Sequence, residues 1–177
     1  LTHRADQLGT VWGVNYSSVD KYLVAKYSGA AFILDAESLE ALCTPYGRLP
    51  VVFFSPDDEQ FAVAIENGFL IGKVTQCSPI REFPSTTEKS IFSISDDWEF
   101  VFEGNDTGKV SVYSTQTGDL QTTLSVSSSA VIKMTTSSSG EYLAASTDKK
   151  TVFFDLTTGE EVGAIGSLLY QVAMQNG

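Results

Sequence analysis

The sequence predicts an all-β protein in which a unit of about forty residues occurs four times. Aromatic residues mark the equivalent position in each unit, with spacings of 39, 39 and 42 residues: Tyr22, Phe61, Phe100 and Tyr142. Short runs rich in Val, Ile, Phe, Tyr and Thr alternate with Gly, Asp, Asn and Ser clusters, which is typical of antiparallel strands joined by tight turns. No segment sustains the period of an amphipathic helix.

The four repeats cover approximately residues 11–48, 49–89, 90–130 and 131–167, and each contains three or four expected strands. Eight positions before each marker aromatic lies an apolar residue: Val14, Phe53, Phe92 and Met134. The repeats therefore keep the same register on both sides of the first turn. Dipeptides such as Asn67-Gly68 and Thr117-Gly118 supply the positive φ angles that tight hairpins need. Each repeat therefore predicts one four-stranded antiparallel sheet.

A four-stranded sheet of this size cannot bury both of its faces alone, so repeated sheets stack on one another. Stacking around an axis gives a β-propeller in which each sheet is one blade. Residues 168–177 are predicted to be the first strand of a further blade. We therefore expect residues 1–177 to form one propeller segment of four blades and the start of a fifth.

Two segments, SPDDEQFAVA at 55–64 and GEYLAASTD at 140–148, are similar to the strand-turn-strand core of WD40 repeats. The Trp-Asp pair that names this family is degraded; its places are taken by Leu34-Asp35, Gly72-Lys73, Tyr113-Ser114 and Phe154-Asp155. At this level of sequence similarity, a divergent WD40 repeat and a propeller repeat of the quinoprotein or TolB type look alike. The WD40 resemblance implies a ring of about seven blades, so we expect the remaining blades to come from the same chain or another one.

The composition argues against several classes of function. The 22 acidic and 11 basic residues give a net charge of −11 and a pI near 4.3, which disfavours direct binding of nucleic acid or of anionic membranes. No apolar run approaches the roughly 20 residues of a membrane span, so membrane insertion is not expected. With His3 as the single histidine, we predict no catalytic residues, no metal site and no cofactor, and hence no enzyme.

The two cysteines, Cys43 and Cys77, fall in different kinds of predicted connection, so we do not expect a disulfide between them. Unpaired thiols fit a reducing compartment, whereas two buried, inert thiols would fit any compartment. The sequence therefore predicts an intracellular protein of the cytoplasm or nucleus.

Candidate partner-binding residues lie in three connections. Trp98 follows Asp96 and Asp97 in an acidic turn, where a partly exposed aromatic side chain would anchor a partner; alternatively, its ring covers a neighbouring blade. Tyr46 and Arg48, in the first long connection, are residue types enriched at the centres of interfaces, although an ordinary loop also accounts for them.

Asp57 and Asp58 occupy a second acidic turn. Adjacent carboxylates in a turn point in different directions and are solvated, whereas general acid-base chemistry needs converging carboxylates with separated pKa values. We therefore assign this pair to a charged surface that contacts partners.

The WD40 resemblance implies a non-catalytic platform for other proteins within a multi-subunit intracellular complex. The acidic surface adds the expectation of partners with Lys- and Arg-rich segments. The alternative is a propeller enzyme or small-ligand binder whose site is completed by blades outside these 177 residues.

Overall fold

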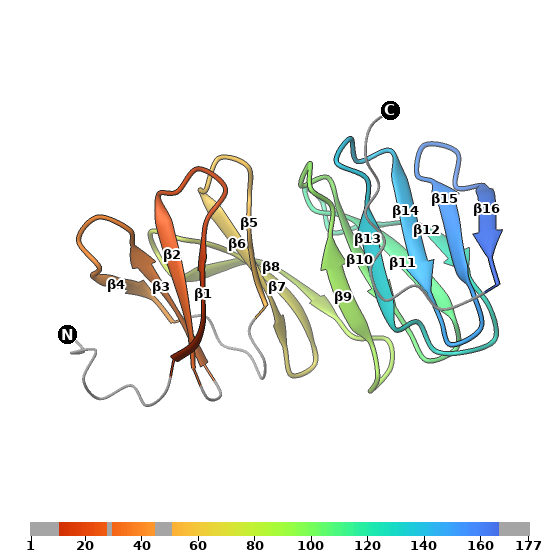
Figure 1. The fold of residues 1–177 in the computed structure, drawn as a ribbon, viewed down its shortest axis with the longest axis horizontal. Helices are drawn as coiled ribbons and strands as arrows, with labels where there is room; N and C mark the ends of the chain where they lie inside the picture. Colours follow the sequence, from red (N-terminus) through yellow and green to blue (C-terminus); the bar gives the residue numbers. More distant parts are fainter. Residues whose placement is uncertain (1–10, 28–29, 45–50, 167–177) are drawn as a thin grey trace. The chain divides into compact units, whose positions relative to one another are not determined.

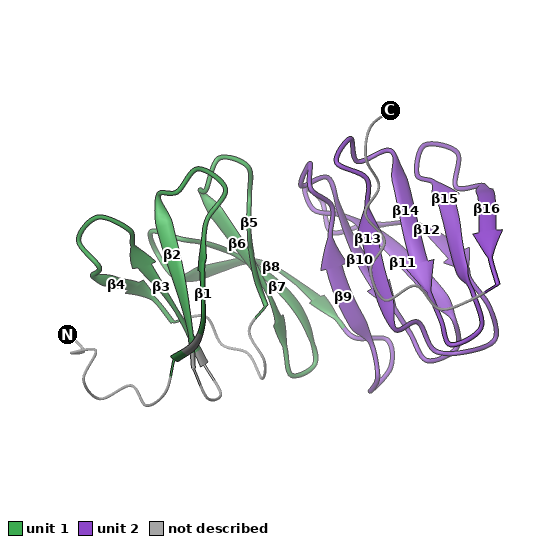
Figure 2. Ribbon diagram, viewed as in Figure 1, with its two compact units in different colours: residues 1–84 green, residues 85–177 purple. Residues whose placement is uncertain are grey.

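The computed structural model describes residues 11–27, 30–44 and 51–166, which form sixteen strands in four antiparallel four-stranded sheets (Figure 1). The chain divides into two compact units, unit 1 with residues 1–84 and unit 2 with residues 85–177, and each contains two sheets (Figure 2). The all-β prediction with four four-stranded sheets is confirmed. The predicted first strand of a fifth blade, at 168–177, lies outside the described residues.

Unit 1 contains the first and second sheets. The first sheet has the strand order β1 (Val11–Tyr16), β2 (Tyr22–Tyr27), β3 (Ala30–Asp35) and β4 (Ala41–Cys43). The second has the order β5 (Val52–Phe54), β6 (Gln60–Ile65), β7 (Gly68–Lys73) and β8 (Ser78–Pro84). Because spatial order follows sequence order, each strand pairs with the strand before it through a short hairpin.

Unit 2 repeats this arrangement with the third and fourth sheets. The third sheet consists of β9 (Ile91–Ile94), β10 (Phe100–Gly104), β11 (Lys109–Ser114) and β12 (Leu120–Ser125). The fourth consists of β13 (Lys133–Thr136), β14 (Tyr142–Ser146), β15 (Thr151–Asp155) and β16 (Glu161–Ile165). All four marker aromatics lie at the start of the second strand of their sheet.

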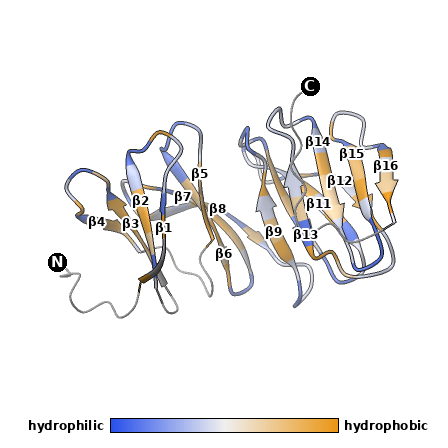
Figure 3. Ribbon diagram, viewed as in Figure 1, coloured by the Kyte–Doolittle hydropathy of each residue, from blue (hydrophilic) through white to orange (hydrophobic). Residues whose placement is uncertain are grey.

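The hydrophobic residues follow the strands, and hydrophilic residues occupy many of the turns (Figure 3). Unit 1 has a buried cluster between its two sheets, made of Tyr22, Val24, Ala31, Ile33, Cys43, Phe61, Val63 and Val74. Unit 2 has a corresponding cluster, made of Phe102, Val110, Val112, Leu124, Val126, Val131, Met134, Leu143, Ala145, Val152 and Phe154. Each unit is therefore held by apolar contact between two facing sheets.

The second strands of the second, third and fourth sheets are buried on both faces over three or four successive residues. Val101 and Phe102 of β10 point to opposite faces of the third sheet, yet each is fully buried. A strand of this kind reads as a continuous apolar run because no position is left for solvent. The sequence shows such runs at the same place in each repeat.

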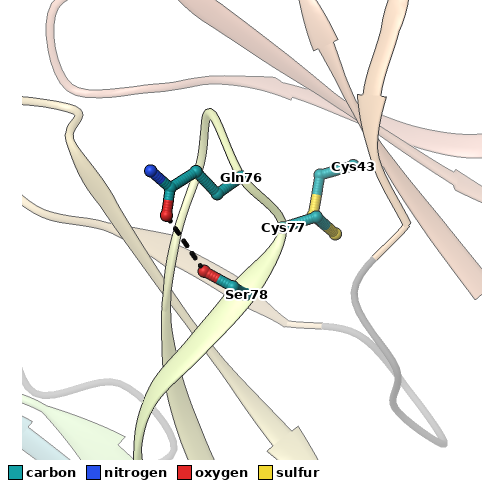
Figure 4. The surroundings of a disulfide bond; sticks show 4 residues. All are labelled: Cys43, Gln76, Cys77 and Ser78. Carbon is teal, nitrogen blue, oxygen red and sulfur yellow. Dashed lines mark hydrogen bonds between the residues drawn. A yellow bond between two sulfur atoms is a disulfide. The ribbon is translucent and has the colours of Figure 1, made fainter.

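Cys43 and Cys77 form a disulfide, so the expectation of free thiols is wrong. Cys43 ends β4 and Cys77 lies in the turn between β7 and β8, and their Cα atoms are 5.1 Å apart across 34 residues of sequence (Figure 4). The two connections differ in kind along the chain, but the contact between adjacent sheets brings them together. The argument from free thiols to a reducing compartment loses its premise.

The packing of the two sheets in unit 2 leads to a first prediction. A Cβ atom at Gly104 of β10 would lie 2.7 Å from Cγ1 of Val131 and 3.2 Å from Sδ of Met134. We expect Gly104→Ala to lower the free energy of unfolding by about 1–3 kcal/mol, because the added methyl group overpacks this contact. Urea denaturation of the purified protein measures the change.

Gly163 of β16 provides the matched control, since a Cβ atom there meets no heavy atom within 4 Å. We expect Gly163→Ala to change the free energy of unfolding by no more than about 0.5 kcal/mol. Equal effects of the two substitutions would contradict the packing of Gly104 against Val131.

Candidate partner-binding surface

A turn of one construction joins the first and second strands of every sheet. It begins with a buried serine, whose backbone N–H donates to the carbonyl of the residue five positions later. The serine Oγ accepts the N–H of that same residue at 2.9–3.1 Å. The four serines are Ser17, Ser55, Ser95 and Ser137. Their hydroxyl groups close the turn, which explains the polar cluster before each marker aromatic.

The fourth position of this turn has a left-handed backbone in every sheet. It is occupied by Asp20 (φ 60°), Asp58 (φ 58°), Trp98 (φ 65°) and Gly140 (φ 75°). Only glycine adopts this conformation without steric cost, so the serine hydrogen bonds hold the other three residues in it. The turn therefore decides where Trp98 and Asp58 lie.

Trp98 is half-buried, and its backbone carbonyl accepts a hydrogen bond from Oγ1 of Thr115. Asp96 and Asp97 beside it are exposed, as predicted for an acidic turn. Nothing in the structure tests their role in partner binding, which stays a prediction. Tyr46 and Arg48 lie outside the described residues.

Asp58 is fully buried, so its assignment to a solvated partner-binding surface is wrong. Its Oδ2 accepts hydrogen bonds from Oγ of Ser17 and from the backbone N–H of Val19, and its Oδ1 accepts the N–H of Ser18 at 2.9 Å. These three donors belong to the first turn of the first sheet and replace water around the carboxylate. Asp58 therefore links the two sheets of unit 1.

Asp57 is exposed, although it precedes Asp58 directly. Its Oδ1 accepts hydrogen bonds from Oγ of Ser55 at 2.6 Å and from the N–H of Glu59 at 3.0 Å. The Ser55 hydroxyl and the Glu59 amide lower the pKa of Asp57, because they favour its charged form. Asp57 thus contributes a persistent negative charge to the surface.

The turns of the third and fourth sheets touch each other. The Asp97 carboxylate lies against Gly140, where a Cβ atom would be 1.8 Å from Oδ2 of Asp97. Asp97 also caps its own turn by accepting the N–H of Glu99 at 3.0 Å. The turn between β9 and β10 and the turn between β13 and β14 therefore form one continuous surface.

In the first and fourth sheets, an Asp at the second position of the WD pair caps the turn between the third and fourth strands. Asp155 ends β15, and its Oδ1 accepts the N–H groups of Thr157 and Thr158 at 2.8 and 2.9 Å. In the first sheet, Asp35 accepts hydrogen bonds from the amide and hydroxyl of Ser38, and these bonds lower the pKa of Asp35. The two repeats that keep this Asp use it as a turn cap.

Charge is distributed unevenly between the two ends of the sheets in unit 2. One end of the sheets, with the turns between first and second strands and between third and fourth strands, has no Lys or Arg among the described residues. We call it the acidic end, and its acidic residues are Asp96, Asp97, Glu99, Asp119, Glu141, Asp155 and Glu160. The described basic residues of unit 2 lie at or near the opposite end, together with three acidic ones: Lys89, Lys109, Lys133, Lys149, Lys150, Glu88, Asp106 and Asp148.

Unit 1 shows the same polarity in its described residues. The corresponding turns contain Asp20, Asp35, Glu37, Glu40, Asp57, Asp58 and Glu59, against Lys21 and Lys73. Because Asp58 is buried and paired, the exposed excess is smaller than in unit 2. The acidic end of unit 2 is therefore the more strongly charged of the two surfaces.

A buried carboxylate that the sequence analysis missed lies in β10. Glu103 is 1% exposed, and its Oε1 accepts hydrogen bonds from the N–H and Oγ1 of Thr86 and from Oγ of Ser90 at 2.6 Å. Its Oε2 accepts the hydroxyl of Tyr113 at 3.1 Å. Burial raises the pKa of Tyr113, and the neighbouring Glu103 charge adds to this effect.

Glu103 attaches the segment before β9 to the third sheet, so its role is structural. A charged residue inside the apolar run FVFEG was the signal available in the sequence, since a buried charge requires partners. No buried side-chain nitrogen or oxygen of the described residues lacks a hydrogen-bond partner.

Within residues 11–27, 30–44 and 51–166, the structure brings together no group of three or more His, Cys, Asp or Glu side chains that would hold a metal ion. In the same part of the chain, no helix is long and apolar enough to cross a membrane.

Comparison with solved structures identifies the fold. The β-propeller domain of Cps50 (Swd1) from Myceliophteria thermophila matches with a TM-score of 0.64 and 17% sequence identity, over 82% of this chain and 53% of that one. A chain of the mitotic checkpoint complex matches with a TM-score of 0.70 and 18% identity, over 89% of this chain and 51% of that one. The chain has the WD40-like β-propeller fold. It spans about half the length of these propeller structures.

No protein-family model matches the sequence, and no curated protein sequence matches it. The degraded WD positions fit this result, because Lys73 and Ser114 stand where the family usually has Asp. The fold is thus WD40-like, although two of the four repeats lack the Asp of the WD40 pattern.

The buried link of Asp58 gives a prediction for unit 1. We expect Asp58→Asn to lower the free energy of unfolding by about 1–3 kcal/mol, because an amide offers one acceptor oxygen where the carboxylate uses two. Chemical denaturation followed by circular dichroism measures this loss. Asp96→Asn is the control, since Asp96 is exposed, and an equal loss in both variants would argue against the link.

Glu103 gives the corresponding prediction for unit 2. We expect Glu103→Gln to lower the free energy of unfolding by about 2–4 kcal/mol, since its amide group would face hydroxyl and N–H donors inside the protein. The exposed Glu99→Gln variant has the same change in charge and is expected to stay near wild type. A wild-type denaturation curve for Glu103→Gln would show that the cluster contributes nothing to stability.

Proposed function

We propose that the protein is a non-catalytic interaction scaffold whose acidic end in unit 2 binds Lys- and Arg-rich segments of partner proteins within a multi-subunit complex. The observation that carries the proposal is the separation of charge in unit 2, where the acidic end has no described basic residue. The WD40-like fold supports it, because one structure of similar fold is a chain of a multi-protein complex, the mitotic checkpoint complex.

The charged surface acts mainly on the rate and selectivity of association. Exposed acidic side chains gathered at one end of the sheets produce a negative potential, which attracts a basic segment and orients it before contact. The hydrogen bonds to Asp97 and Asp155 fix the turns that present these charges. Trp98 in the same surface would contribute apolar contact to the bound segment.

The proposal includes a location in the cytoplasm or nucleus. Imaging a fluorescent fusion in the source cells tests this part. A secreted or vesicular signal would contradict the location and leave the charge argument intact.

Affinity purification of the full-length protein at low and physiological ionic strength, with quantitative mass spectrometry, tests the scaffold. We expect a stoichiometric set of proteins whose recovery falls as salt rises. Recovery of the protein alone at both salt concentrations would overturn the proposal and favour a ligand site completed by further blades.

The surface itself is tested with two triple variants that remove the same charge. In the acidic-end variant, Asp96→Asn, Glu99→Gln and Asp119→Asn, we expect association with the main basic partner to slow about threefold to tenfold at low salt. The control variant changes exposed residues near the opposite end of unit 2: Glu88→Gln, Asp106→Asn and Asp148→Asn. Stopped-flow or surface-binding kinetics distinguish them, and equal slowing would exclude a specific role for the acidic end.

A further inference from the structure

The strand β4 is held differently from the fourth strands of the other sheets. It has three residues, whereas β8 has seven, β12 six and β16 five. Its pairing with β3 is limited to Ile33 with Cys43 and Leu34 with Ala41, with an irregular register between them. Hydrogen bonding alone therefore holds β4 weakly.

Side-chain burial gives β4 little further support. Ala41 and Leu42 are exposed, and Cys43 is the only buried side chain of the strand, with 4% exposure. Cys43 lies in the cluster with Ile33, Phe61 and Val74, and its sulfur is bonded to Cys77 (Figure 4). The disulfide is thus the main attachment of β4 to the second sheet.

Cys77 occupies a position that favours glycine. Its φ is +48°, and the corresponding turns of unit 2 have Gly118 at φ +82° and Gly159 at φ +73°. A cysteine in this conformation is strained relative to glycine. The disulfide explains why the second sheet has cysteine at this position. In the first sheet the corresponding residue is Leu39, with φ +58°, so a side chain is also tolerated there.

We propose that the Cys43–Cys77 disulfide is a redox-operated latch, which fixes β4 when oxidised and releases it when a dithiol reductant reduces the bond. The proposal goes beyond the scaffold function and does not rest on it. Disulfides in reducing compartments are mostly transient or redox-sensing, so an intracellular location and a latch are compatible.

Reduction proceeds by thiol-disulfide exchange. A thiolate of the dithiol attacks the sulfur of Cys77, which is the less buried of the two cysteines, and the Cys43 sulfur leaves and takes up a proton. The second thiol of the reductant then attacks the mixed disulfide and releases Cys77 as a thiol. Two electrons and two protons pass to the protein, and the reductant leaves as a disulfide.

Release of β4 changes the edge of the first sheet. The backbone of β3 at Ile33 and Leu34 would lose its pairing partner, and an unpaired strand edge accepts a strand from another chain. The core strands β2 and β6 keep their apolar contacts, so the rest of unit 1 stays folded.

Amide hydrogen exchange, read by NMR on the full chain, tests the latch. With dithiothreitol as the reductant, we expect exchange at Leu42 and Cys43 to accelerate at least tenfold, while β6 and β16 stay unchanged. Alkylation and mass spectrometry confirm that both thiols are free, and oxidised dithiothreitol is expected to restore slow exchange. Slow exchange at β4 with both thiols free would overturn the proposal.

The variant Cys77→Gly separates the latch from a general staple. It removes the disulfide and places a favoured residue at the turn, so unit 1 is expected to fold with fast exchange at β4 with or without reductant. Protected β4 amides in this variant would show that the disulfide does not hold the strand. Fast exchange throughout β2 and β6, in the variant or in the reduced protein, would also overturn the latch, because the disulfide would then stabilise the whole unit.

Discussion

The need to cover both faces of each four-stranded sheet determines the rest of the structure. In β10, Val101 and Phe102 face opposite sides and both are fully buried, which one isolated sheet cannot achieve. Each unit solves part of this problem by pairing two sheets around an apolar cluster. Because burial of apolar surface is non-directional, it brings the sheets together without fixing how they meet. Polar and covalent contacts between neighbouring sheets supply that precision.

The two units fix their paired sheets in different ways. In unit 1 the carboxylate of Asp58 reaches into the first turn of the neighbouring sheet, and the Cys43–Cys77 disulfide joins the outer parts of the sheets. In unit 2, close contact takes over: Gly104 admits Val131, and Gly140 admits the carboxylate of Asp97. Glycine at these two positions allows the close approach, and the Ser127 hydroxyl adds a hydrogen bond to Oγ1 of Thr147 at 3.2 Å.

The repeats, the strands and the turns could be predicted from the sequence because their signals are local. Serines, glycines and marker aromatics act within one hairpin, and forty-residue spacing places them in equivalent sheets. Asp57 and Asp58 show where this reasoning ends: they are adjacent and identical in type, yet one is exposed and one is fully buried. The difference depends on Ser17, Ser18 and Val19, about forty residues earlier in the chain. The disulfide depends on the same contact between the two sheets. Because the sequence does not show how the sheets meet, it predicts neither the burial of Asp58 nor the disulfide. Of the candidate site, the exposed acidic turn beside Trp98 was predictable, whereas the Glu103 cluster required the fold.

The acidic end of the sheets has two kinds of carboxylate, and the distinction bears on function. Asp35, Asp57, Asp97 and Asp155 accept backbone N–H groups of their own turns, so the fold explains their charge. Glu37, Glu59, Asp96, Glu99 and Glu160 are exposed, and their side chains cap no turn in the described structure. Like charges placed close together repel and lower the stability of the folded state. Selection for folding alone would favour neutral or basic residues at these positions, and at the opposite end of unit 2 acidic residues are interspersed with lysines. In the scaffold function proposed above, the basic groups of a partner would neutralise the surplus charge on binding, and that neutralisation would offset the cost that the free protein bears.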